Sequence, residues 1–405
     1  MRFKLSLFLS IIFIASMPAY ADGGARISAA IAAMRPTGGV YDFRNQGAIS
    51  AESTIVIDKP VTLLLDGTQL TLNGTPGILI ESNGVRIEGS TGQTKLIQGG
   101  TVGGGGNHNV IYGNALSDLK IEGVTFVGIP GTMPEDDTNA IRLQNAAAGN
   151  IRRVRIVGNT FTGFCLHAVL IQNATDVTVE DNTIEQVSDG IRFSGVEGGK
   201  ILGNTILNTQ LPNSGAFAVA IGLDTTAPLD DGVSYPICRD IHISRNTVST
   251  YVNGEGIMIH AGAGVSITDN VFDNVLMGIG INPFNSTDLL YHVTVTGNTY
   301  VGTLTPGALS STGNYGIYVG GGEGTVTPSY VVVTANIISQ ANEIARSTGQ
   351  SGIGIGYADH VLVEGNLIHD SVCNGIKLRN PTSRIVVKDN YVTGITGPGR
   401  DSAYN

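Results

Sequence analysis

The chain has 405 residues, of which 56 are glycine and 14% are charged, and its formal net charge is −10. Nucleic-acid binding through phosphate contacts needs a concentrated positive field, so this charge argues against a nucleic-acid partner. Abundant glycine and few charges are typical of short strands joined by tight turns.

The first 21 residues have the features of a secretory signal peptide. Two basic residues precede an apolar run from Leu5 to Ala15, which is too short to span a bilayer, and Ala19-Tyr20-Ala21 has the small-x-small pattern of a cleavage site. We therefore expect residues 1–21 to be removed and residues 22–405 to be secreted or periplasmic, with no membrane span.

Residues 22–38 are predicted to contain a capping helix. Apolar residues recur at helical spacing from Ala25 to Met34, and Pro36 and Gly38-Gly39 break the pattern. The open end of a solenoid exposes backbone and core, so we expect this helix to cover the N-terminal end of the fold.

One pattern then recurs along most of the chain: a small residue, an aliphatic, an outward residue and a second aliphatic. Nine copies begin at Ala140, Ala168, Gly190, Ala220, Gly256, Gly278, Gly316, Gly352 and Gly375. Each is followed by a second alternating strand and an asparagine, at Asn159, Asn182, Asn204, Asn246, Asn270, Asn298, Asn336, Asn366 and Asn390. The shortest repeat is about 22 residues, and self-similarity at such a period indicates a solenoid.

Stacking these repeats in parallel predicts ladders of like residues, with aliphatic side chains inside and polar ones outside. Each recurrent asparagine is expected to bond the backbone of a turn and the asparagine of the next coil, which is a structural role. The repeats resemble the right-handed parallel β-helix superfamily, the pectate-lyase-like group that includes polygalacturonases. The resemblance implies an all-β, single-stranded right-handed parallel β-helix, and we count about 11–12 coils within residues 22–405.

Insertions border one face of this predicted solenoid. They precede the small-aliphatic strand at Ile129–Thr138, Asn208–Ala218, Thr303–Asn314 and Gln340–Gln350, and follow it at Thr225–Arg239, Pro283–Tyr291 and Gly320–Ser329. Loop insertions in repeat proteins collect on one face, often the binding face. We therefore expect a trough whose floor is the outward side of that strand.

Alternation within the strand places three columns of residues on this floor. The central column is Arg142, Leu170, Arg192, Gly222, Met258, Gly280, Tyr318, Gly354 and Lys377. The next is Gln144, Gln172, Ser194, Asp224, His260, Asn282, Gly320, Gly356 and Arg379. The entrance column is Asn139, His167, Asp189, Val219, Glu255, Met277, Tyr315, Ser351 and Asn374.

Four ionisable residues in neighbouring coils are predicted to be catalytic. Asp189 and Glu255 lie two coils apart, so their Cβ atoms are expected about 9.6 Å from each other. Inverting glycosidases use two carboxyl groups separated by roughly 6.5–9.5 Å, which leaves room for the attacking water. Asp224 and His260 share a column on adjacent coils and are expected to tune the protonation of the pair. This pattern predicts a glycoside hydrolase.

Other polar residues of the floor are predicted to bind a polysaccharide or oligosaccharide, with basic side chains holding uronate carboxylates or hydroxyls. The predicted substrate-binding residues are Arg142, His167, Gln172, Arg192, Asn282, Tyr318, Lys377 and Arg379.

The segment Ser188-Asp189-Gly190-Ile191 is similar to the Asn-Thr-Asp-Gly-Ile motif of polygalacturonases, and the resemblance implies that Asp189 is catalytic. The chain departs from the family on the following coils. Ala218-Val219 stands where the family has Asp-Asp, and Gly254-Glu255-Gly256 where it has Gly-His-Gly. Lys377-Leu378-Arg379 reverses the family's Arg-Ile-Lys and lies several coils farther on.

A polysaccharide lyase is the second interpretation. By resemblance, lyases of this fold abstract a proton with Lys, Arg or His, so His167, Arg192 or His260 would be the base. They often use Ca²⁺ to neutralise a uronate, and the acidic segments Glu135-Asp136-Asp137 and Asp230-Asp231 carry oxygen ligands of the kind that Ca²⁺ prefers. Neither segment has an ordered ligand spacing, so we expect no metal site and no required cofactor. Only the lyase interpretation would involve Ca²⁺.

A non-catalytic surface adhesin or scaffold is the third interpretation, because glycine-rich stretches such as Gly103–Gly106 suit an exported repeat protein. The segment Gly394–Asn405 has no obvious cap, so both a homotrimer and a monomer are compatible with the sequence. A trough open across Asp189–His260 favours an enzyme, and a trough filled by its loops favours a scaffold. Among the three interpretations we favour an enzyme acting on a polysaccharide, with hydrolase ahead of lyase.

Overall fold

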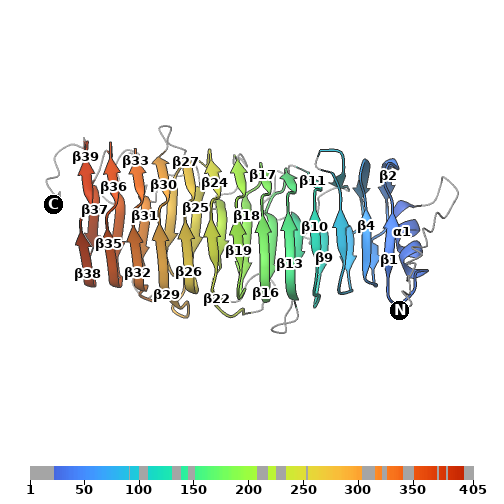
Figure 1. The fold of residues 1–405 in the computed structure, drawn as a ribbon, viewed down its shortest axis with the longest axis horizontal. Coiled ribbons are helices and arrows are strands. Elements are labelled where there is room, and N and C mark those ends of the chain that lie inside the picture. Colours follow the sequence, from blue (N-terminus) through green and yellow to red (C-terminus); the bar gives the residue numbers. More distant parts are fainter. Residues whose placement is uncertain are drawn as a thin grey trace, which may run out of the picture.

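The computed structural model describes residues 22–90, 92–99, 108–129, 138–144, 151–207, 218–224, 234–251, 254–302, 315–321, 326–340, 351–371, 374–379 and 382–395. The predicted signal peptide and most of the predicted loop insertions lie outside these residues. Within them, three parallel sheets run side by side along the whole molecule, and each complete coil contributes at least one strand to each sheet (Figure 1).

The 12-stranded sheet contains the small-aliphatic strands, and we call it the floor sheet. Its strands, in order, are β3 (Ile55–Ile57), β6 (Ile78–Ile80), β9 (His108–Gly113), β12 (Thr138–Leu143), β15 (His167–Gln172), β18 (Asp189–Ser194), β21 (Ala218–Leu223), β25 (Gly254–Ile259), β28 (Met277–Ile281), β31 (Tyr315–Gly320), β34 (Ser351–Gly356) and β37 (Asn374–Arg379).

The 14-stranded sheet follows the floor sheet along each coil. Its strands are β1 (Gly39–Asp42), β4 (Val61–Leu64), β7 (Arg86–Glu88), β10 (Lys120–Glu122), β13 (Ile151–Val157), β16 (Ala174–Glu180), β19 (Lys200–Leu202), β23 (His242–Ser244), β26 (Gly262–Thr268), β29 (Leu290–Thr296), β32 (Ser329–Thr334), β35 (Asp359–Glu364) and β38 (Ser383–Lys388), with β22 (Cys238–Arg239) paired to β26.

The 13-stranded sheet completes each coil. Its strands are β2 (Gly47–Ala51), β5 (Thr68–Leu72), β8 (Lys95–Gln98), β11 (Thr125–Val127), β14 (Thr160–Thr162), β17 (Thr183–Glu185), β20 (Thr205–Leu207), β24 (Thr247–Ser249), β27 (Val271–Val275), β30 (Thr299–Gly302), β33 (Ile337–Ser339), β36 (Leu367–His369) and β39 (Tyr391–Thr393). The predicted all-β parallel β-helix is confirmed. The 12 strands of the floor sheet agree with the 11–12 coils predicted.

Ladders of identical side chains fill the interior, as the repeat predicts. In the floor sheet, Ile257 pairs with Ile279, which pairs with Ile317, and the ladder continues to Ile353. These four side chains are at most 1% exposed. Parallel stacking thus buries one aliphatic residue of each coil against the same residue of the next, and the core runs the length of the molecule.

The recurrent asparagines form a continuous buried ladder, which confirms their predicted structural role. The Asn246 amide donates to Oδ1 of Asn270 at 2.9 Å and to the Ile201 carbonyl at 2.9 Å. Its own Oδ1 accepts from the amide and the backbone N–H of Asn204, both at 2.9 Å. Asn246 therefore satisfies polar groups of three coils at a turn that excludes water.

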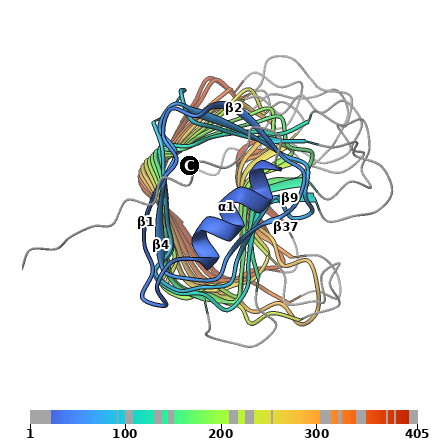
Figure 2. The ribbon, with the colours of Figure 1, turned by 90° about the vertical axis from the view of Figure 1, so that its right-hand side faces the viewer.

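Helix α1 (Gly23–Ala32) lies across the N-terminal opening of the solenoid (Figure 2). The predicted cap is confirmed, but the helix begins two residues before the predicted Ala25. The reason is Asp22, whose carboxylate accepts the free N–H groups of Gly24 and Ala25 and so starts the helix. Ile27 and Ile31 are fully buried and close the first coil. Among the described residues, no helix has the length and apolar character needed to cross a membrane.

Candidate functional site

The strand register places the predicted columns of the floor sheet as expected. His167 pairs with Asp189 between β15 and β18, and Val219 pairs with Glu255 between β21 and β25. The pairing of Ile191 with Ile221 sets Asp189 beside Val219. The entrance column therefore runs His167, Asp189, Val219 and Glu255 on four consecutive coils, with each carboxylate in a different setting.

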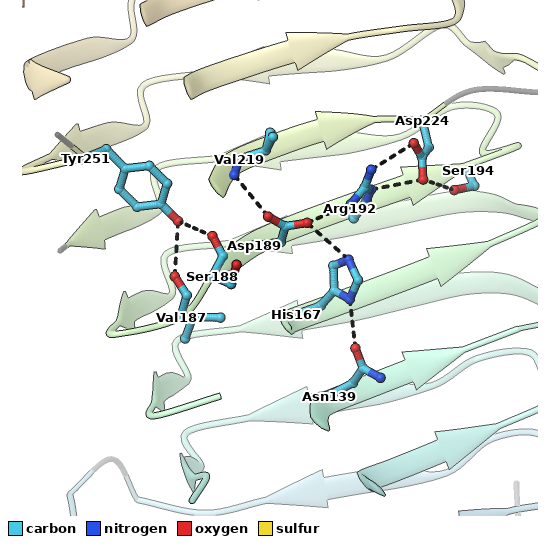
Figure 3. Close-up of polar contacts among 10 residues, drawn as sticks. All are labelled: Asn139, His167, Val187, Ser188, Asp189, Arg192, Ser194, Val219, Asp224 and Tyr251. Atoms are coloured by element: carbon cyan, nitrogen blue, oxygen red, sulfur yellow. Dashed lines mark hydrogen bonds and ion pairs between the residues drawn. The ribbon is translucent and has the colours of Figure 1, made fainter. Parts of the chain in front are cut away.

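Arg192 joins two of the predicted catalytic carboxylates. Its Nη1 lies 2.6 Å from Oδ2 of Asp189, while its Nε and Nη2 lie 2.9 and 3.0 Å from the two oxygens of Asp224 (Figure 3). Asp224 is 4% exposed, and Oγ of Ser194 donates to it at 3.5 Å. Three of the five guanidinium N–H groups thus face carboxylate oxygens, so Arg192 acts first as the counter-ion of Asp189 and Asp224.

A chain of polar side chains approaches Asp189 from the preceding coils. The amide of Asn139 donates to Oδ1 of Asn109 at 3.0 Å, and its own Oδ1 accepts from Nδ1 of His167 at 2.8 Å. Nε2 of His167 lies 3.5 Å from Oδ2 of Asp189. The backbone N–H of Val219 donates to the other oxygen of Asp189 at 3.0 Å (Figure 3). Both oxygens of Asp189 therefore face donors or cations.

The pKa of Asp189 is lowered by this environment. Burial alone would raise the pKa of the carboxyl, but His167, the charge of Arg192 and the Val219 N–H together hold the pKa below its ordinary value. Asp189 is only 8% exposed, so these groups replace the water that would otherwise solvate its charge.

Glu255 has the opposite environment. In its column it lies between Val219 and Met277, both apolar. Burial against these neighbours raises the pKa of Glu255 to about 7, and the negative charge of Asp189 adds to the effect. The carboxylate pair therefore consists of one group held ionised and one held protonated up to neutral pH.

An apolar patch continues the floor beyond Glu255. Met258, Met277 and Tyr315 form a cluster on the outward face, with Val219 and Tyr318 packed against it. Glycines in the central column make room for these side chains: a Cβ at Gly280 would lie 2.5 Å from Cε of Met258. The floor therefore changes from polar at Arg192 to apolar at Tyr318.

His260, immediately after β25, lies across the floor from Glu255. Its Nδ1 is 2.8 Å from the Asn282 carbonyl and donates to it, which directs Nε2 away from the backbone. Burial lowers the pKa of His260, against the opposing effects of that carbonyl and of Asp224, so the ring is neutral near pH 7. The ring of Phe284 meets His260 edge to face, with centroids 5.6 Å apart.

The predicted substrate-binding residues differ in burial and in their position along the floor. Arg142, His167 and Gln172 are at most 8% exposed, and Nε of Arg142 donates to the Gln144 side chain at 2.8 Å. Asn282 and Tyr318 are partly exposed on the floor.

Lys377 and Arg379 form a separate, distal region of the floor. Six register steps separate Lys377 from Arg192, a distance of about 29 Å. Arg379 lies over the ring of Tyr315 at 5.9 Å. The register therefore unites the four predicted catalytic residues and leaves the last basic pair outside their site.

Two supporting contacts were not predicted from the sequence. The hydroxyl of Tyr251 donates to the carbonyls of Val187 and Ser188, at 3.3 and 3.0 Å, and so anchors the turn that leads into Asp189. The Val219 N–H that binds Asp189 is a backbone group. No periodic pattern marks either contact, since both depend on which coils the stacking brings together.

No group of three or more His, Cys, Asp or Glu side chains suited to a metal ion occurs among the described residues. The acidic segments Glu135-Asp136-Asp137 and Asp230-Asp231 lie outside them. The metal prediction is therefore not tested at those segments.

The comparisons with known proteins agree with the fold. A family described as a right handed beta helix region matches residues 111–302. No curated protein matches the sequence. Among solved structures, a family 28 exopolygalacturonase of Yersinia enterocolitica superposes with a TM-score of 0.63 at 11% identity, covering 94% of this chain and 77% of that one.

Two further solved structures are similar. The A-module of a mannuronan C-5 epimerase of Azotobacter vinelandii has a TM-score of 0.57 at 15% identity, covering 94% of this chain and 96% of that one. A DFA-IIIase mutant of Arthrobacter chlorophenolicus A6, in complex with DFA-III, has a TM-score of 0.55 at 12% identity, with coverages of 95% and 98%. At these identities the likeness is one of fold. The stacked sheets and the family match over residues 111–302 agree that this chain has the fold of a right-handed parallel β-helix.

Proposed function

We propose that this protein is a glycoside hydrolase that cleaves a polysaccharide on the floor sheet, with Glu255 as general acid and Asp189 as general base. The observation that carries the proposal is the opposed titration of the pair: the pKa of Asp189 is lowered, and that of Glu255 is raised to about 7. Paired carboxyl groups whose environments separate their pKa values are the usual basis of acid–base assignments.

The spacing of the pair supports an inverting reaction. Two register steps separate Asp189 from Glu255, about 9.6 Å at Cβ, which is near the upper end of the range for inverting enzymes. Protonated Glu255 gives its proton to the glycosidic oxygen as the carbon–oxygen bond breaks. Asp189 takes a proton from the water whose oxygen bonds to the anomeric carbon. Proton exchange with solvent then restores both groups.

Arg192 and His167 are assigned positioning roles in this proposal. They hold Asp189 ionised and oriented, with one oxygen bound by the Val219 N–H. Support from similar folds is general: the similar structures are those of an exopolygalacturonase, a mannuronan C-5 epimerase and a DFA-IIIase bound to DFA-III. A carbohydrate substrate is consistent with all three.

Substitution of Asp189 by Asn tests the proposal. The wild type is screened for release of reducing ends from neutral and uronic glycans, and D189N is expected to lose activity by about a thousandfold, in the range of general acid–base contributions. The exposed Asp273 in β27 provides the matched control, and D273N should retain full activity. NMR of the first product should show inversion at the anomeric carbon. Full activity of D189N, with thermal unfolding like the wild type, would rule out the assignment.

A polysaccharide lyase is the second candidate, and His260 is the observation that favours it. Its Nδ1–H is engaged by the Asn282 carbonyl and its pKa is lowered by burial, so Nε2 is suited to accept a proton at neutral pH. A lyase would generate an unsaturated product that absorbs in the ultraviolet, whereas a hydrolase would not. The appearance of that absorbance on uronic glycans, with or without added Ca²⁺, would replace the hydrolase by the lyase.

A further inference from the structure

We propose that Phe284 and His260 form a subsite for a neutral sugar unit at the far edge of the floor, across from the carboxylate pair. The inference rests on the proposed glycan substrate and adds a residue, Phe284, that the pattern of floor columns does not contain. Its elements are an exposed aromatic ring, a backbone turn that holds it and an imidazole nitrogen beside it.

The exposed ring belongs to a turn that is built around a buried carboxylate. Phe284 is 68% exposed, whereas Asp288 in the same turn is completely buried. The Asp288 carboxylate accepts the backbone N–H groups of Phe284 and Asn285, at 3.0 and 2.7 Å. The backbone N–H of Asp288 donates in return to the Asn285 carbonyl at 3.2 Å. The turn thus presents Phe284 in a defined place without burying it.

The ring is continuous with the candidate site. It meets His260 at an interplanar angle of 63°. His260 follows β25, the strand that carries Glu255, and its backbone N–H donates to the Leu223 carbonyl next to Asp224. Five residue-to-residue steps of extended chain, about 16 Å, lead from Glu255 to His260, so the subsite holds a unit outside the scissile linkage.

The chemistry of the subsite matches a sugar ring. An aromatic face packs against the apolar C–H face of a saccharide, while Nε2 of a neutral His260 accepts a hydrogen bond from a hydroxyl.

Local charge selects a neutral sugar over a uronate at this edge. Among the residues that the structure describes, the charged groups that act on His260 are Asp224, Asp288 and Arg192. They comprise two carboxylates and one guanidinium, and Arg192 is already bound by Asp224 and Asp189. The excess negative charge disfavours another carboxylate there.

Binding to dextran, xylan, inulin, galactomannan and polygalacturonate, measured by affinity electrophoresis, tests the subsite. All variants carry D189N, so that turnover plays no part. F284A is expected to weaken binding to a neutral glycan three- to tenfold, and F284W to restore it. Y391A is the control, because Tyr391 is 65% exposed on the last coil, and it should bind like the parent.

Three results would overturn the inference: equal binding by F284A and the parent, no binding of any neutral glycan, or dependence on Phe284 for polygalacturonate alone. Hydrolysis assays on the wild type and on F284A, both with Asp189 present, distinguish failure of the subsite from failure of the proposed hydrolase. If the wild type cleaves a glycan and F284A leaves KM unchanged, only the subsite fails. If neutral glycans bind through Phe284 and none is cleaved, the subsite stands and the hydrolase fails.

Discussion

Asp189 and Glu255 lie in one column of the floor, two coils apart, and titrate in opposite directions because their neighbours differ. Asp189 is next to His167 and the Val219 N–H and is paired with Arg192, all of which favour its charged form. Glu255 lies between the apolar side chains of Val219 and Met277, which favour its neutral form. Two similar carboxyl groups thus acquire different pKa values from the side chains of the adjacent coils.

The activity should depend on pH in a way that reflects the pKa values of these two carboxyl groups. Glu255 must be protonated to act as an acid, and its pKa is raised to about 7, so activity should be full below that pH and fall tenfold per unit above it. Asp189 must be ionised to act as a base. Because its pKa is lowered, activity should fall only at a pH below the ordinary pKa of an aspartate. Profiles of kcat/KM against pH would show both limbs.

Glu255→Gln provides the matching variant, because it keeps the size of the side chain and removes the acidic proton of the carboxyl group. Its residual activity should lack the alkaline limb. An alkaline limb near pH 7 that persists in E255Q would assign the acid to another group, with His260 as the first to examine.

At the scale of elements, the asparagine ladder connects the turns of successive coils. Asn246 is 1% exposed and bonds groups on coils before and after its own. Asn390 ends the ladder and is partly exposed, so water can replace its contacts. Similar side chains in the same turn therefore contribute unequally according to their position along the solenoid.

Alanine substitutions should reveal this difference. We expect N246A to reduce the free energy of unfolding by about 2–4 kcal/mol, because it leaves several buried polar groups unpaired. N390A should reduce it by less than about 1 kcal/mol. Urea unfolding followed by circular dichroism measures both, with Q69A on the exposed face of β5 as control. Equal losses for the two asparagines would contradict a ladder stabilised by exclusion of water.

At the scale of the whole molecule, parallel stacking turns positions distant in sequence into one surface. Residues from β15 to β28 meet at the candidate site, although more than a hundred residues separate His167 from Asn282. The same stacking carries Lys377 about 29 Å away from Arg192 along the axis. A long glycan that follows the floor would reach both, and a short one would not.

Lys377→Met should therefore discriminate by substrate length. We expect KM for a long polymer to rise two- to fivefold, as for loss of a partly exposed charge, with kcat unchanged. KM for oligosaccharides too short to reach β37 should not change. Lys388→Met is the control, since Lys388 pairs with Glu364 on another sheet. An equal rise in KM for short and long substrates would place Lys377 in the central site and contradict the register.

The fold was predictable from local pattern because a solenoid repeats one set of contacts. The small-aliphatic strands, the period and the asparagines determine the stacking, and stacking determines which residues share a column. Asp189, Asp224, Glu255 and His260 were identified together for that reason. The capping helix followed from helical spacing, although the role of Asp22 in starting it depends on contacts with Glu52 and Ser53.

Other features were decided only by the tertiary structure. The sequence alone placed Arg192 among substrate-binding residues, whereas the structure places it between Asp189 and Asp224. The Val219 N–H, the Tyr251 hydroxyl and the Phe284 turn leave no periodic signal, because backbone donors and irregular turns do not repeat. Strand periodicity determined which side chains face outward and in what order. Their protonation and partners were decided by burial and by contacts between coils, which depend on three-dimensional distances that a one-dimensional pattern does not contain.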